Sequence, residues 1–172
     1  MALSSKDYYD SISAGYDELH GAEQQQKISR IKEHLKIIKG HTLLDVGCGT
    51  GLSTRAWDCA RTGIDPSPEL IKIAMANDPL GTYLVGEAEH LPFKDGSFDI
   101  VVSVSAIHNF HDPMKGLSEI KRVGRQVFAL SVLKRCKGFQ AISRAILLNF
   151  PISKIVKDDK DIIFLALKEQ NL

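Results

Sequence analysis

Residues 43–51 read LLDVGCGTG, and this stretch decides the fold. Its first four residues lie in a short apolar run, 41–46 (HTLLDV). This run predicts a buried strand that leads directly into a turn. Glycines at 47, 49 and 51 let the backbone turn sharply and pass close to a ligand, although ordinary turns use glycine as well. A dinucleotide-binding loop would have its third glycine at position 52, where this chain has leucine, so the sequence disfavours a pyrophosphate ligand.

Outward from this stretch, strand patterns alternate with helix patterns. Apolar residues spaced by three and four predict a helix over 24–38, which Gly40 ends. The expected strands are 41–46, 61–65, 82–86, 98–105, 126–133, 153–156 and 162–167, and the other expected helices are 52–59, 67–76, 113–123 and 139–148. This alternation predicts an α/β fold with a parallel sheet covered on both faces, closed by an antiparallel hairpin around residues 157–160.

Length and composition indicate one domain over residues 1–172. The chain is 44% hydrophobic and 25% charged, which excludes disordered, collagen-like and disulfide-scaffold proteins. Its three cysteines are widely spaced and form no zinc half-site, as in proteins of a reducing interior. The N-terminus has no signal-peptide pattern, and no run approaches the roughly 18 apolar residues of a membrane span. We therefore expect a cytoplasmic protein with no membrane contact.

The net charge of +1 conceals an uneven distribution of charge along the chain. Residues 113–157 contain one acid, Glu119, and ten basic residues, namely Lys115, Lys121, Arg122, Arg125, Lys134, Arg135, Lys137, Arg144, Lys154 and Lys157. The basic segment is either a site for a polyanion or a set of side chains that face water on separate surfaces.

Acidic residues follow the second and third predicted strands. Asp65 ends the second strand 18 residues after Gly47, where a carboxylate can accept hydrogen bonds from ribose hydroxyls. The alternative is that Asp65 caps the helix that follows it. Glu87 follows the third strand. Because the carboxyl ends of parallel strands meet at one edge of a sheet, these three residues should share a site.

Three stretches taken together resemble the class I S-adenosylmethionine-dependent methyltransferases. They are LLDVGCGTG at 43–51, TGIDPSPELIKIA at 62–74 and GEAEHLPFKDGSFDIVVS at 86–103. The resemblance implies a Rossmann-like, doubly wound sheet of seven strands, mostly parallel with the last strand antiparallel. It divides the chain into an N-terminal helical lid region, 1–39, and a sheet core, 40–172. It also implies S-adenosyl-L-methionine as cofactor, S-adenosyl-L-homocysteine as product, and no metal.

The resemblance assigns the methionine and ribose parts of the cofactor to residues after the first two strands. Asp45, Gly47 and Gly49 would hold the methionine portion. Asp65 would bind the ribose hydroxyls, and Pro66 would lie against the adenine face.

The remaining implied contacts lie on three other segments. Glu87 would accept from the adenine amino group, and Ala88 would offer its backbone N–H to the ring. The backbone at Ser103 would meet the cofactor's amino group. Residues 8–17 resemble the family's lid segment, in which Tyr16 would contact the cofactor.

His108 is the candidate base for an acceptor that must lose a proton. It follows the fourth predicted strand, on the side of the presumed acceptor. Two alternatives are open: a neutral ring that shapes the rim of the site, or a metal ligand together with His111, for which no third ligand is evident nearby.

The acceptor is indicated only indirectly. Residues 104–107 lack the N-P-P-Y motif of some amine methyltransferases, and only about twenty residues separate the fifth strand from the hairpin, too few for an inserted lid. An open site beside the basic segment favours RNA, either tRNA or rRNA. A small-molecule acceptor and a non-catalytic cofactor-binding or scaffold protein are the alternatives. By family analogy, a small activator subunit is a further expected partner.

Overall fold

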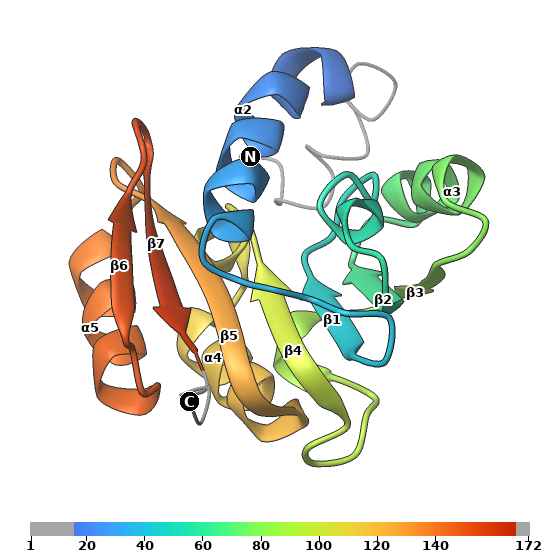
Figure 1. Ribbon diagram of the computed structural model, residues 1–172. Coiled ribbons are helices and arrows are strands. Elements are labelled where there is room, and N and C mark those ends of the chain that lie inside the picture. The colour runs from blue at the N-terminus through green and yellow to red at the C-terminus, as the bar shows by residue number, and fades with distance from the viewer. Residues whose placement is uncertain (1–15, 168–172) are drawn as a thin grey trace.

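The computed structural model describes residues 16–167, with side chains from residue 21 onward. Within that range seven strands form one sheet in the order β3-β2-β1-β4-β5-β7-β6 (Figure 1). β7 is antiparallel to both its neighbours, and the pairs among β1 to β5 are parallel, which confirms the predicted sheet. The strands are β1 (Thr42–Val46), β2 (Ala60–Asp65), β3 (Thr82–Val85), β4 (Phe98–Ser103), β5 (Gly124–Leu133), β6 (Lys154–Lys157) and β7 (Asp161–Ala166).

The strand order changes direction between β1 and β4. β2 and β3 lie on one side of β1, and β4 begins the other half of the sheet. In open α/β sheets, ligands bind outside the carboxyl ends of the strands at such a switch point. A ligand of this sheet is therefore expected at the carboxyl ends of β1 and β4.

Between residues 16 and 167, four α-helices connect or cover the strands. They are α2 (Tyr16–Lys32), α3 (Pro68–Asn77), α4 (Pro113–Val123) and α5 (Phe139–Asn149). The predicted cap of α3 is confirmed, because Ser67 Oγ accepts a hydrogen bond from the Leu70 N–H at 3.1 Å. None of the helices between residues 16 and 167 has the length and apolar content that crossing a bilayer requires.

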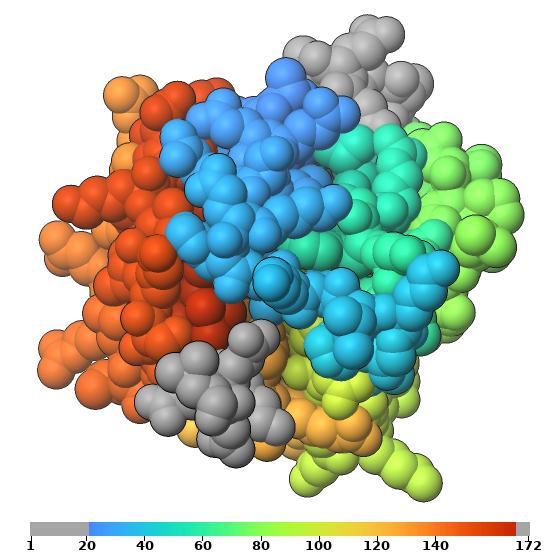
Figure 2. Space-filling view, viewed as in Figure 1, coloured from blue at the N-terminus to red at the C-terminus, as the bar shows by residue number. Residues whose placement is uncertain are grey.

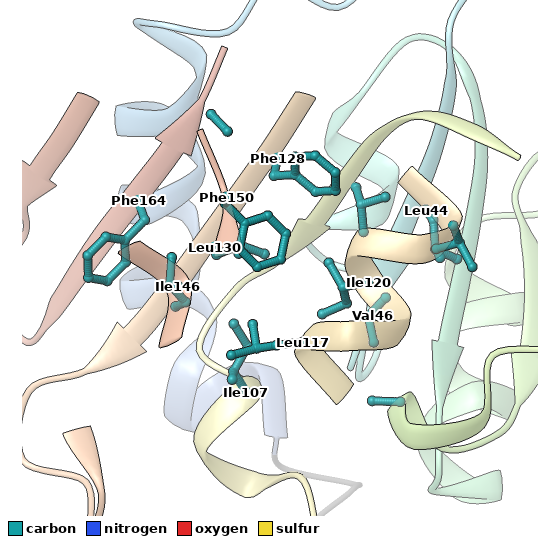
Figure 3. Close-up of a cluster of buried hydrophobic side chains, with 14 of the residues drawn as sticks. Leu44, Val46, Ile107, Leu117, Ile120, Phe128, Leu130, Ile146, Phe150 and Phe164 are labelled. Atoms are coloured by element: carbon teal, nitrogen blue, oxygen red, sulfur yellow. The ribbon is translucent and has the colours of Figure 1, made fainter. Parts of the chain in front are cut away.

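Each face of the sheet has its own apolar cluster, which confirms the doubly wound arrangement. Successive residues of a strand point to opposite faces. In β4, Val101 packs with α4 and α5, whereas Val102 packs with α2. In β5, Leu130 packs with α4 and α5, and Ala129 packs with α2. Figure 3 shows the α4–α5 side, where Leu117, Ile120 and Ile146 pack against strand residues.

The structure corrects the end of the first predicted helix. The helix was expected to continue to Ile38 and to end at Gly40, but α2 ends at Lys32. Leu35 still packs against the sheet, whereas Ile38 is 62% exposed and outside the apolar stripe. The chain leaves the helix because it must cross to the start of β1.

The helix predicted over 52–59 is also wrong. Only a 3-10 turn, η2 (Thr54–Ala56), forms there. The hydroxyls of Ser53 and Thr54 turn inward to the buried carboxylate of Asp45, and Trp57 is buried against the sheet. These contacts, together with the early start of β2 at Ala60, leave no room for two helical turns.

Candidate functional site

The loop after β1 passes through three glycines with left-handed backbones. Gly47, Gly49 and Gly51 have φ values of 76°, 55° and 77°. The Gly47 N–H donates to the Ile64 carbonyl at 2.8 Å, which ties the loop to β2. A Cβ at Gly47 would lie 2.4 Å from the Cβ of Ala106. Glycine is therefore needed at this position to let the loop pack against the segment that follows β4.

Asp45 is buried at the end of β1. The hydroxyls of Ser53 and Thr54 both donate to its Oδ2, Thr54 at 2.7 Å. Its Oδ1 is also buried and has no hydrogen-bond partner within residues 16–167. Burial raises the pKa of Asp45 to about 6, and the negative charge of Asp65 acts in the same direction. The carboxylate is therefore kept ionised at neutral pH against a desolvation penalty.

Asp65 holds the glycine loop against the start of the helix after β2. Its Oδ2 accepts from the Gly49 N–H at 2.9 Å, and its Oδ1 accepts from the Ser67 N–H at 3.0 Å. Its backbone carbonyl accepts from the Gly86 N–H at 3.0 Å, which joins the ends of β2 and β3. Pro66 follows directly and is half-buried.

Glu87 lies at the carboxyl end of β3, and its side chain is 68% exposed. It precedes the 3-10 turn η3 (Ala88–His90), whose first residue is buried in the cluster beneath α4. The next acid, Glu89, is the buried one, and its Oε1 accepts from the Asp112 N–H at 2.8 Å. Glu87 is thus available to a ligand, whereas Glu89 anchors the loop before α4.

Ser103 links the two strands that flank the switch point. Its side chain is fully buried, and its Oγ donates to the Val46 carbonyl at 2.8 Å. The hydroxyl is therefore occupied, and only the backbone can serve the predicted contact with the cofactor's amino group. Tyr16 is the first residue of α2, but its side chain and the lid segment before it lie outside the described residues.

His108 lies on the 3-10 turn η4 (Ile107–Asn109), which the fully buried Ile107 anchors. The imidazole is half-buried, and its Nδ1 has no hydrogen-bond partner in the part of the chain that the structure describes. Burial lowers the pKa of His108, with the charge of Asp161 opposing this effect and that of Lys27 adding to it. Burial therefore favours the neutral form of the ring, which is the form that a base needs.

A buried polar network lies beside His108, and the sequence predictions did not include it. Lys27 Nζ lies 3.0 Å from Asp161 Oδ1, 2.7 Å from Ser105 Oγ and 2.6 Å from Glu23 Oε1. Asp161 Oδ2 accepts from the hydroxyls of Ser105 and Ser131 at 2.7 and 3.0 Å. One sequence signal could have indicated the network: Lys27 directly precedes Ile28, which belongs to the apolar stripe of the helix.

The same face of α2 contacts the β6–β7 hairpin. Gln26 and Arg30 donate to Asp158 Oδ1 at 3.1 and 2.9 Å, and Lys160 pairs with Glu23. Figure 2 shows α2 lying between the hairpin and the segment that follows β1. These contacts fix α2 against the hairpin.

The basic segment, 113–157, does not form a single cationic surface. Arg122 pairs with Glu119 and Asp95, and Arg125 pairs with Asp99. Lys134 donates to backbone carbonyls in the β6–β7 turn. The other seven basic residues are exposed, and they are distributed over α4, the loop after β5, α5 and β6.

Two of the exposed cations lie near the candidate site. Arg135 and Lys137 belong to the loop directly after the carboxyl end of β5.

In residues 16–167, no three His, Cys, Asp or Glu side chains are grouped as metal ligands.

Known proteins similar to this chain are methyltransferases and their relatives. Residues 44–127 match a family model described as a methyltransferase domain. An uncharacterized protein of Methanocaldococcus jannaschii is 36% identical over 123 residues, which are 70% of this chain and 47% of that protein. The malonyl-[acyl-carrier protein] O-methyltransferase of Herminiimonas arsenicoxydans is 35% identical over 130 residues, covering 70% of this chain and 48% of the enzyme.

Among solved structures, a similar chain comes from the complex between the Haloferax volcanii Trm112 methyltransferase activator and its methyltransferase partner. The TM-score is 0.68 at 28% identity, over 77% of this chain and 62% of that one. This chain spans about half the length of the curated relatives that it matches.

Proposed function

The chain belongs to the class I S-adenosylmethionine-dependent methyltransferase family, and from this premise we propose that it binds S-adenosyl-L-methionine at the carboxyl ends of β1, β2 and β3 and methylates an acceptor. The observation that carries the proposal is the buried Oδ1 of Asp45 at the switch point of the sheet, which has no hydrogen-bond partner among the described residues. A buried carboxylate oxygen without a donor is unfavourable unless a ligand supplies one.

The residues present fit this cofactor. Asp45 and the left-handed Gly47 and Gly49 would hold its methionine portion, since ammonium groups donate to carboxylates and left-handed backbones expose peptide groups. Asp65 would accept from the ribose hydroxyls, with Pro66 against the adenine.

The adenine end would be bound by the loop after β3. Glu87 would accept from the amino group, and the backbone of Ala88 would donate to the ring. The backbone at Ser103 and the side chain of Tyr16 complete the proposed contacts.

When bound, S-adenosylmethionine supplies a methyl group activated by a sulfonium, so the protein mainly orients the acceptor and excludes water. His108 would accept a proton from the acceptor. Its half-buried ring lies on the turn beyond β4, and burial lowers its pKa, which favours the neutral form that a base needs. No step in this scheme requires a metal.

Calorimetry with S-adenosylmethionine and S-adenosylhomocysteine tests cofactor binding. Glu87→Ala alters an exposed side chain, so the fold should persist while affinity falls by about tenfold, the value of one hydrogen bond to a charged group. Asp58→Ala, which removes an 81%-exposed carboxylate near the start of β2, is the matched control. Absence of binding by the wild type would exclude S-adenosylmethionine as the cofactor. Equal affinities of all three proteins would exclude the contact at Glu87.

For the acceptor we propose RNA, supported by the exposed Arg135 and Lys137 after β5. Tritiated-methyl transfer should be measured on RNA, protein and small-molecule fractions. Replacing both residues by Glu should weaken RNA methylation and its salt dependence, whereas the same change at Lys154 and Lys157 on β6 should not. Label in the protein or small-molecule fraction would instead favour an acceptor like that named for the Herminiimonas relative.

We also propose that a small activator subunit binds at β3, as an activator accompanies the Haloferax methyltransferase. β3 is an edge strand. Two of its side chains, Leu84 and Val85, are apolar and exposed, and so are Met75 and Leu80 in the preceding segment. An unpaired edge with apolar neighbours can accept a strand from a partner.

Co-expression with a Trm112-type activator tests this surface. Leu84→Glu with Val85→Glu should abolish co-purification. The same changes at the exposed Leu147 and Leu148 of α5 serve as the control. Loss of the complex in both pairs, or in neither, would contradict the assigned surface.

A further inference from the structure

The buried network beside His108 joins four elements that are distant in sequence. Lys27 lies on α2, Ser105 follows β4, Ser131 lies in β5, and Asp161 begins β7. The side chains of Lys27 and Asp161 are only 1% and 0% exposed. A buried ion pair contributes little net stability relative to apolar side chains of the same size, so stability alone does not explain it.

Ser105 is the point at which the network acts on the backbone. Its φ is 55°, which makes it the one non-glycine residue with positive φ in the described chain, and this conformation costs roughly 1–2 kcal/mol. Its N–H donates to Ser131 Oγ at 2.7 Å. Its hydroxyl accepts from Lys27 and donates to Asp161, both at 2.7 Å. All three polar contacts of Ser105 thus maintain a strained turn.

This turn separates the cofactor end of the site from the acceptor end. Ser103, whose side chain is tied to β1, lies two residues before Ser105, and His108 lies three residues after it. The charged groups that act on the His108 ring are Asp161, from β7, and Lys27, from α2. The same two side chains therefore fix the turn and provide the local field.

We propose that Lys27, Ser105 and Asp161 are positioning residues, which hold the turn after β4 so that the imidazole of His108 faces the acceptor. The inference rests on the proposed methyltransferase function. Its test does not use activity, because the titration of His108 can be followed without cofactor or acceptor.

NMR titration of ¹⁵N-histidine-labelled protein, with the His108 signals assigned through His108→Gln, measures the pKa directly. In Asp161→Asn the pKa should fall below the wild-type value, because the side chain that raises it is removed. In Lys27→Met it should rise, since Asp161 keeps its two serine donors. A merely structural role gives a different result: loosening exposes the ring and raises the pKa in both variants.

Two further proteins complete the experiment. Ser105→Gly tolerates the positive φ but loses the hydroxyl, so it should broaden or split the His108 signals while the fold persists. Arg30→Met removes an ion pair between α2 and the hairpin without touching Ser105, and should leave the titration unchanged. If Asp161→Asn does not fold, Lys27→Met and Ser105→Gly decide.

The proposal is overturned if Asp161→Asn leaves the His108 pKa unchanged or raises it, or if Lys27→Met and Ser105→Gly both give wild-type His108 signals. Failure of the wild type to bind S-adenosylmethionine in calorimetry would refute the proposed function instead, and would leave the titration result standing.

Discussion

Replacement of Asp45 by Asn should stabilise the ligand-free protein at neutral pH and leave it unchanged in acid. The pKa of Asp45 is raised from 3.8 to about 6 by burial, so the folded protein holds this proton more tightly than the unfolded chain does. At about 1.4 kcal/mol per pH unit, this difference corresponds to about 3 kcal/mol. That stability is fully present below pH 3.8 and is lost as the pH rises to about 6.

The neutral amide that Asp45→Asn introduces does not ionise, so the variant keeps the stability that the carboxylate loses. The amide oxygen can still accept from Ser53 and Thr54, and the amide nitrogen takes the place of an atom that has no partner within residues 16–167. Any fixed effect of the amide is independent of pH. The quantity to measure is therefore the change with pH in the stability difference between the two proteins.

Urea unfolding of both proteins between pH 4 and pH 8 provides this measurement. The difference should grow by about 2–3 kcal/mol up to about pH 6 and then level off. Asp58→Asn, at an 81%-exposed carboxylate, should show no such trend. A difference that is the same at pH 4 and pH 8 would refute the reasoning.

Three other substitutions test the local geometry by urea unfolding. Gly47→Ala should cost at least about 2 kcal/mol, because φ is 76° and the new Cβ would lie 2.4 Å from Ala106 Cβ; a near-wild-type midpoint would contradict this. Tyr83→Phe should cost about 1–2 kcal/mol, since the hydroxyl donates to the buried Asp78 at 2.8 Å, and no loss would show that this bond is neutral. Ser67→Ala should cost about 1 kcal/mol through loss of the α3 cap, and an unchanged stability would mean that the cap is dispensable.

The sequence predicts those parts of the fold whose determinants lie within a few residues. The bounds of α4, 113–123, agree with the prediction because Pro113 opens the helix and the preceding Asp112 accepts from two of its N–H groups. The helix expected over 52–59 fails for the opposite reason. Its hydroxyl residues are recruited by Asp45, a partner eight and nine residues away on another element.

The candidate site likewise contains residues whose positions local sequence predicts and residues whose partners it does not predict. The positions of the glycine loop, Asp65 and Glu87 could be predicted because each lies at the end of its own strand, and parallel topology brings strand ends together. The partnership of Lys27 with Asp161 joins positions 134 residues apart, through a helix whose docking no local pattern specifies. In a single sequence, a lysine beside an apolar stripe does not identify its counterion.

The proposed function gives a reason for an unfavourable carboxylate at the end of β1. Asp45 is buried, and the negative charge of Asp65 makes its ionisation still less favourable. No lysine or arginine is among the groups that shift its pKa. A cationic ligand at this position would favour the ionised form, and S-adenosylmethionine carries both a sulfonium and an ammonium group. In ligand-free protein the ionised Asp45 therefore opposes folding, and under the proposed function a bound cation would make the same carboxylate a source of affinity. A carboxylate that lowers stability without ligand and raises affinity with ligand is typical of a binding site and is not expected of a structural carboxylate.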